Sequence, residues 1–232
     1  MAARIRRPYT ETRERIEIEG NAVKVVTERV NKVIKLDDFL TAIGNNAGVV
    51  TPILPNGCRF FRSKQSHSVL VIEKPPQMRQ LNWVGMHSDT TKTSWKLAFP
   101  YTVFVLDLID LAFNRSFIFY RTTPLSSPDD RLFHSNLCNV DGTGIICTGN
   151  IRAAGNSITE KADNFIAAFW ASQFNTDLMG YNFTVDSRST KQVSSLETWQ
   201  KSSKEDPLFP LSVTWREYDS VANIVGNRFR EL

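Results

Sequence analysis

The most regular feature of this chain is a series of short apolar runs in its middle, separated by polar or turn-forming residues. Residues 57–62 and 68–73 form two such runs, and the polar segment SKQSH between them predicts a hairpin. Pro75-Pro76 is expected to end the second run. Four further strands are expected over residues 80–85, 95–99, 101–110 and 116–122. With a turn at Asn114-Arg115, the pattern predicts an antiparallel meander.

The residues before the meander carry a different periodicity. Between residues 22 and 33, valines recur at spacings of three and four, which is typical of one face of a helix. These valines are β-branched, which weakens the helix prediction and leaves a pair of strands as the alternative. Asp37-Asp38 then predicts the cap of a short helix over residues 39–43, which Gly44 would end.

The strongest helix signal follows the meander. Ser157 and Glu160 have the spacing of a capping box, and Phe165, Phe169 and Trp170 continue an apolar face. This helix should end between residues 172 and 175. Residues 182–207 are rich in Ser, Thr and Lys and are expected to form a loop, and LFPLSVTWREY near the end suggests one more strand.

Composition and charge describe an ordinary globular protein with a basic start. The chain has 232 residues, 41% of them hydrophobic, and a net charge of +4. Arginines cluster in the first fifteen residues, so binding of nucleic acid through this arm is one hypothesis, and a solvated terminus is the other. No apolar stretch is long enough to span a bilayer, and the charged N-terminus has no apolar region of the kind that a signal peptide needs, so no membrane association is expected.

The cysteines and histidines point away from metal chemistry. Three cysteines form no disulfide framework, which favours a reducing, cytoplasmic setting. The three histidines lack metal-ligand spacing, and no phosphate-binding glycine motif occurs. We therefore expect neither a metal nor a cofactor.

The most distinctive chemistry lies in the segment from Asn139 to Cys147, NVDGTGIIC. A tight turn at Asp141-Gly142 would fold Asn139 back beside Cys147. A cysteine thiolate is a nucleophile, and a nearby amide donor can hold the oxyanion that forms when the thiolate attacks a thioester. The alternatives are that Cys147 is a small buried apolar residue and that Asn139 caps its own turn.

This segment resembles the active-site loop of ubiquitin-conjugating enzymes, in which an Asn precedes the nucleophilic Cys by the same distance. The chain is most similar to the bacterial branch, in particular prokaryotic ubiquitin-conjugating-like family D and the related PRTRC system protein B. The shared motifs are Asn139-Val140, Gly144, Ile146-Cys147-Thr148-Gly149 and the segment FWASQFN at 169–175. Leu137-Cys138 stands where the eukaryotic motif has His-Pro.

The resemblance implies an α+β fold: a ubiquitin-conjugating-like antiparallel meander with a helix packed on it after the Cys loop, plus an N-terminal α/β extension. The corresponding domains are residues 1–90 for the partly strand-rich extension, 91–180 for the conjugating core, and 181–232 for a polar loop and closing segment.

The resemblance also implies a function. Cys147 would accept a ubiquitin-like protein as a thioester from a ThiF-type activating enzyme and pass it to an amine on a protein target. The alternative is a catalytically inert relative that serves as a binding or assembly module in a phage or plasmid-encoded complex. For the carrier, the expected source is a bacterium or a mobile element.

Two more residues of this segment are candidates for catalysis. Asp141 would orient or deprotonate the incoming amine, or else only shape the turn. His134 would be a general base, or else a turn or surface residue. Cys138 and Cys58 are expected to be structural.

Overall fold

A computed structural model describes residues 15–19, 22–26, 31–35, 53–64, 66–84, 92–149, 151–175 and 191–230. The chain forms two compact units, Met1–Thr51 and Pro52–Leu232. The first domain boundary, expected after residue 90, differs from this division, in which the first unit ends at Thr51.

The first unit contains a sheet of three antiparallel strands in the order β1-β2-β3. The strands are β1 (Arg15–Glu19), β2 (Ala22–Val26) and β3 (Asn31–Lys35). The helix suggested over residues 22–33 is therefore wrong, and the strand-pair alternative is confirmed. The β-branched residues explain the outcome, because Val23 pairs with Ile34 across the ladder. The short helix expected at 39–43 lies outside the described residues.

The second unit is built on an antiparallel sheet of six strands in the order β12-β10-β9-β8-β5-β4. These strands are β4 (Cys58–Lys64), β5 (His67–Lys74), β8 (Tyr101–Ile109), β9 (Ala112–Arg121), β10 (Arg131–His134) and β12 (Glu217–Ser220). The hairpin of β4 and β5 is confirmed, and so is the antiparallel pairing of the sheet. The meander is confirmed only in part, because β5 pairs with β8 and the strands expected at 80–85 and 95–99 lie outside this sheet. The strand suggested within LFPLSVTWREY is β12. It begins at the last two residues of that segment and continues to Ser220.

The second hairpin turn lies elsewhere than expected. It is formed by Asp110 and Leu111, both with positive φ (49° and 61°), and not by Asn114-Arg115. Two positive φ values suit the twist of a two-residue hairpin turn. Asn114 is instead the extra residue of a bulge, and its amide donates to the Asp107 carboxylate at 3.1 Å.

A second, smaller sheet has the order β11-β6-β7. It consists of β6 (Gln77–Val84), β7 (Lys92–Phe99) and β11 (Gln173–Phe174), and the first two cover the strands expected at 80–85 and 95–99. β6 and β7 are antiparallel, whereas β11 runs parallel to β6. β11 follows the helix α2 (Ile158–Ala171), so this helix connects the candidate Cys loop to the small sheet.

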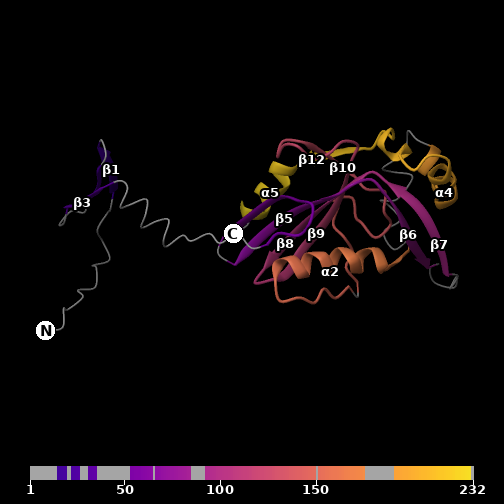
Figure 1. The fold of residues 1–232 in the computed structure, drawn as a ribbon, viewed down its shortest axis with the longest axis horizontal. Coiled ribbons are helices and arrows are strands. Elements are labelled where there is room, and N and C mark those ends of the chain that lie inside the picture. Colours follow the sequence, from indigo (N-terminus) through magenta and orange to yellow (C-terminus); the bar gives the residue numbers. More distant parts are fainter. Residues whose placement is uncertain are drawn as a thin grey trace. The chain divides into compact units, whose positions relative to one another are not determined.

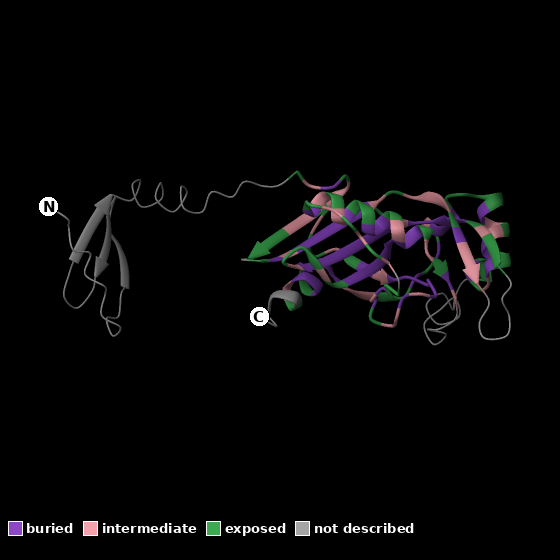
Figure 2. Ribbon diagram, turned by 90° about the horizontal axis from the view of Figure 1, so that it is seen from below, coloured by how far each residue is buried: buried purple, intermediate pink, exposed green. Residues whose placement is uncertain are grey.

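Both faces of the six-stranded sheet are covered, which explains why its central strands are almost continuously apolar. On β5, Leu70 and Ile72 face a core shared with α2, whereas Val69 and Val71 face a second core shared with α5 (Val221–Arg230). Figure 1 shows α2 across one face and α5 beside β12, and Figure 2 shows buried residues along the central strands.

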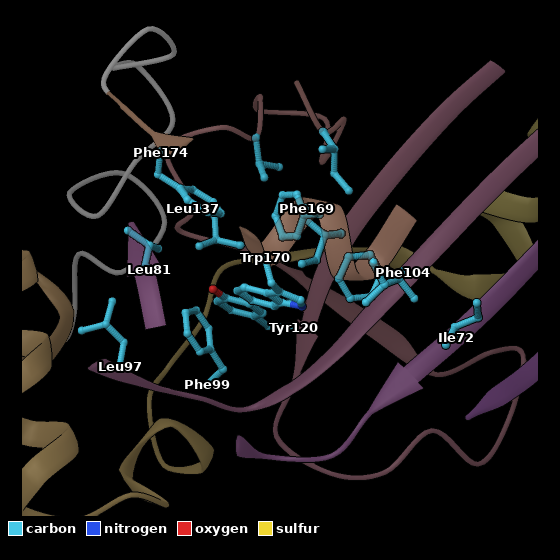
Figure 3. Packing of buried hydrophobic residues seen from close by; sticks show 14 of the residues in the cluster. Ile72, Leu81, Leu97, Phe99, Phe104, Tyr120, Leu137, Phe169, Trp170 and Phe174 are labelled. Carbon is cyan, nitrogen blue, oxygen red and sulfur yellow. The ribbon is translucent and has the colours of Figure 1, made fainter. Parts of the chain in front are cut away.

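The larger core is rich in aromatic rings. Phe99 of β7 lies with its ring centroid 4.9 Å from that of Trp170 and 5.0 Å from that of Trp199, in edge-to-face geometry. Phe104 of β8 packs against Phe169 at 5.7 Å. Figure 3 shows Phe99, Tyr120 and Trp170 gathered beside Phe169. These rings pack the end of α2 against both sheets.

The expected helix cap is confirmed. The Ser157 hydroxyl accepts from the Glu160 backbone N–H at 3.1 Å, and α2 ends before Ser172. In a reciprocal capping box the Glu160 carboxylate would accept from the backbone N–H of Ser157. Here it accepts from the backbone N–H of the preceding residue, Asn156, at 2.8 Å.

Residues 182–207 do not form only a loop. The described part contains the 3-10 turn η2 (Lys191–Val193) and the helix α4 (Leu196–Glu205), which Ser195 and Thr198 cap reciprocally. A second 3-10 turn, η3 (Phe209–Leu211), follows. The composition was misleading because α4 buries only Leu196, Trp199 and Ser203.

Side chains of α4 form hydrogen bonds with backbone groups along the outer edge of β7. The Ala98 N–H donates to the Ser203 hydroxyl at 2.8 Å, and the Ala98 carbonyl accepts from Trp199 Nε1 at 2.8 Å. The Lys96 N–H donates to Gln200 Oε1 at 2.9 Å. A helix therefore protects an edge that would otherwise be open to pairing with another strand.

We predict that Ser203→Ala lowers the free energy of unfolding by about 1–3 kcal/mol, because it leaves the buried Ala98 N–H without its acceptor. Urea denaturation measures this loss. Ser202→Ala, one position along the same helix, is the control and should change stability by no more than about 0.5 kcal/mol. Equal losses in the two variants would contradict the role of Ser203.

Candidate active site

The segment from Asn139 to Cys147 is a small hairpin. Val140 and Ile146 form an antiparallel bridge, and the Asp141 N–H donates to the Ile145 carbonyl at 3.0 Å. One step outward, the Cys147 N–H donates to the Asn139 carbonyl at 2.8 Å. Asn139 and Cys147 are therefore directly opposite each other, and the spacing seen in the sequence is the register of this hairpin.

The loop of the hairpin is held by Asp141 and Gly144. One oxygen of the Asp141 carboxylate accepts from the Thr143 N–H at 2.8 Å, the Thr143 hydroxyl at 2.7 Å and the Ile145 N–H at 2.9 Å. Gly144 has φ +84°, and a Cβ there would lie 2.4 Å from Cε1 of Phe119. Glycine is required at this position for both reasons.

The hairpin is fixed to the large sheet through β9. The Ile146 N–H donates to the Ser116 carbonyl at 2.8 Å, and the Ile118 N–H donates to the Gly144 carbonyl at 3.0 Å. The side chains of Val140 and Ile146 are buried in the larger core. Because side chains alternate along a strand, Asn139 and Cys147 point the other way.

Cys147 is exposed and lines a surface groove of about 670 Å³ with Asn139, so the alternative of a small buried cysteine does not hold. Other residues of the groove are Val84, Thr148, Gly149, Ile151, Arg152, Ala168, Ala171, Ser172, Gln173 and Asn175. The other two thiols are less accessible. Cys138 is buried, which raises its thiol pKa to about 12, and burial also raises the pKa of half-buried Cys58.

The Asn139 side chain braces the segment after α2. Its Nδ2 donates to the Gln173 carbonyl at 2.9 Å, and its Oδ1 accepts from the Asn175 N–H at 3.2 Å. These two groups flank Phe174, so the amide makes the two bonds that a neighbouring strand would make to β11. An amide nitrogen carries two hydrogens, so the Gln173 carbonyl uses only one of the two.

The family model for prokaryotic E2 family D matches residues 58–213, more than half of the chain. The chain belongs to this family. The match starts at β4 and runs through the Cys hairpin, α2 and α4 as far as Val213, so it covers most of the second unit. No curated protein and no solved structure matches the chain. The family is described as prokaryotic and supports a ubiquitin-conjugating-like function.

In this E2 family D chain, His134 does not line the groove of Cys147. It lies in β10 with its ring buried, and the ring centroid is 4.8 Å from that of Tyr218 in edge-to-face geometry. Burial, assisted by the charge of Arg216, lowers the pKa of His134 to about 4. Asp141 does not line the groove either, and its carboxylate holds the hairpin loop.

The structure adds groove residues that the sequence analysis did not single out. Arg152 is the only charged residue among the described residues that line the groove. Gln173 and Asn175 bind Asn139 through their backbones, which no side-chain motif encodes. The signal available for Arg152 was a basic residue soon after the candidate nucleophile.

In the described ranges, no three His, Cys, Asp or Glu side chains come together as metal ligands would. No helix in this part of the chain is long and apolar enough to cross a membrane.

The buried imidazole of His134 predicts a pH dependence of stability. Below about pH 6.5 the unfolded chain takes up a proton at this residue, whereas the folded chain does so only near pH 4. The stabilisation is therefore present in full above pH 6.5 and is lost as pH falls towards 4, by roughly 1.4 kcal/mol for each pKa unit of the shift. Urea denaturation at pH 7, 6 and 5 measures the slope.

His134→Phe keeps a ring against Tyr218 but cannot be protonated, so its stability should fall less steeply over this range. Parallel curves for the wild-type protein and His134→Phe would show that His134 takes up its proton equally in both states.

Proposed function

We propose that this chain is a ubiquitin-conjugating-like carrier that accepts a ubiquitin-like protein as a thioester on Cys147 and passes it to an amine. The observation that carries the proposal is an exposed thiol opposite Asn139, in a groove, in a chain of prokaryotic E2 family D. The antiparallel meander with α2 packed after the Cys hairpin is compatible with a ubiquitin-conjugating-like fold.

Loading is an exchange between thioesters. The Cys147 thiolate attacks the carbonyl carbon at the modifier's C-terminus, a new C–S bond forms, and the bond to the activating enzyme's cysteine breaks. The leaving group is the activating enzyme's thiolate, so no oxidant or reductant is needed. Among the three cysteines, Cys147 is the exposed one, which suits attack on a large protein substrate.

Discharge transfers the modifier to an amine of the protein target. The amine nitrogen attacks the thioester carbonyl, whose oxygen takes the electron pair and becomes an oxyanion. When the carbonyl re-forms, the C–S bond breaks and the Cys147 thiolate leaves, while the proton of the amine passes to water. The second hydrogen of Asn139 Nδ2 is the proposed donor to the oxyanion.

The partners follow from this chemistry. They are a ubiquitin-like protein, a ThiF-type activating enzyme that adenylates and loads it, and a protein target. Catalytic roles for Asp141 and His134, binding of nucleic acid by the basic N-terminal arm, a cytoplasmic setting and a mobile-element origin stay predictions. Because the Asp141 carboxylate already accepts three hydrogen bonds in its own loop, its stronger role in this arrangement is to shape the hairpin.

The test is to incubate the chain with its activating enzyme, modifier and ATP. We expect an adduct that a reducing agent cleaves. Cys147→Ser should give a slower adduct that resists reduction, because an oxyester replaces the thioester, and Cys147→Ala should give none. Cys138→Ala and Cys58→Ala are matched controls that should keep the labile adduct. An adduct that survives Cys147→Ala would refute the assignment of the nucleophile.

One observation favours the inert assembly module instead. Both ends of the Asn139 amide are engaged by the backbone around β11, and the Asp141 carboxylate is engaged in its own loop. If these polar side chains stabilise the hairpin, the protein needs them for its fold even when it has no catalytic activity. A wild-type chain that never charges under the conditions above would support this second function.

Asn139→Ala separates the structural from the catalytic role of Asn139. Loss of two hydrogen bonds to the segment after α2 should lower the free energy of unfolding by about 1–3 kcal/mol in total. Loss of an oxyanion donor should also slow discharge by about 10²–10³-fold, with a smaller effect on loading. We expect both effects, measured by urea denaturation and single-turnover discharge. Normal discharge from a destabilised variant would leave only the bracing role.

A further inference from the structure

The groove beside Cys147 has an uneven charge distribution. Its described lining residues include one cation, Arg152, and no carboxylate. Arg152 is exposed and makes no ion pair with any described residue. Its one hydrogen bond within this part of the chain runs from Nη1 to the Ile151 carbonyl at 3.3 Å. A guanidinium has five N–H donors, so most of them are available to a ligand.

Arg152 is directed to the groove by its neighbours in the chain. Ile151 and Ala153 pack against the larger core, so the side chain between them faces outward. A turn in which the Ile151 N–H donates to the Thr148 carbonyl at 2.7 Å brings the chain back towards Cys147. Arg152 therefore lines the same groove as the sulfur although five positions separate them.

Because Asn139 also braces the segment after α2, a cation in the groove would add to the stabilisation of negative charge beside Cys147. Thiolate attack and the following tetrahedral intermediate both place negative charge beside the Cys147 sulfur. Asn139 is neutral, and one of its two N–H groups is already bound to the Gln173 carbonyl. The side chains described around the groove offer no other positive charge.

We propose that Arg152 is the anion-binding side chain of this groove and stabilises negative charge beside the Cys147 sulfur. For the thioester step this inference rests on the proposed carrier function, but the attraction between Arg152 and an anion at Cys147 does not. The electrostatic part can therefore be tested without a modifier or an activating enzyme.

The experiment compares two alkylating reagents of similar size, anionic iodoacetate and neutral iodoacetamide. Their rates at Cys147 are measured on the folded full chain by mass spectrometry of the peptide that carries this residue. The fraction of thiolate is common to both reactions, so the ratio of the two rates reports the charge felt by an anion at the sulfur. Arg152→Gln should lower the iodoacetate to iodoacetamide ratio by up to about sixfold, the factor that Coulomb's law gives in water for one unit charge about 4 Å from an anion, with a smaller factor at a larger separation.

Two further variants and a salt series complete the design. Arg152→Lys should keep most of the ratio, because it retains the charge. Lys201→Gln removes the same charge from the exposed side of α4, away from the lining of the groove, and should leave the ratio unchanged. In about 1 M salt the wild-type ratio should approach that of Arg152→Gln, because screening acts within about 3 Å at that ionic strength.

An unchanged ratio in Arg152→Gln would overturn the inference, even if both reagents were slowed equally, because equal slowing reports only the access to the sulfur or its reactivity and not an attraction for anions. Failure of the chain to accept a modifier would instead refute the carrier proposal and leave the measured ratio unaffected. The two ideas therefore fail by different measurements.

Discussion

The candidate site depends on the burial of one cross-strand pair, Val140 and Ile146. Their side chains are 1% and 3% exposed, and full burial of such a residue is worth about 1.5–3 kcal/mol. This pair fixes the register of the hairpin, and a slip by one residue would turn Asn139 and Cys147 into the core. The exposure of the thiol and its position opposite the amide are thus consequences of apolar packing beneath them.

The second constraint is the connection between the two sheets of the larger unit. α2 carries the chain from the Cys hairpin, which is attached to β9, to β11 in the small sheet. The Asn139 amide then bonds to the backbone on both sides of Phe174, whose ring is 5.4 Å from Phe169. One side chain therefore links the hairpin that carries Cys147 to the far end of the helix and defines a wall of the groove.

Stability and chemistry share residues at this site. Asp141 and Gly144 shape the loop, and Asn139 ties the hairpin to β11, so the polar side chains of Asn139 and Asp141 both have structural partners. A donor that is already held by a hydrogen bond is preorganised, which is an advantage when it must face a developing charge. Among the described residues that line the groove, Arg152 is the one that carries a positive charge.

The sequence by itself determined the elements whose signals are local. The alternating runs of the meander, the Ser157 cap and the turn chemistry of Asp141-Gly142 each act between neighbours in the chain, and family membership was readable from the motifs around Cys147. Signals without tertiary context misled at residues 22–33, at Asn114 and over 182–207. Only the tertiary structure decided that α4 covers the edge of β7, that His134 is buried against Tyr218, and that Arg152 shares a groove with Cys147. These outcomes depend on which distant surfaces meet, and a single sequence does not encode that in any local pattern.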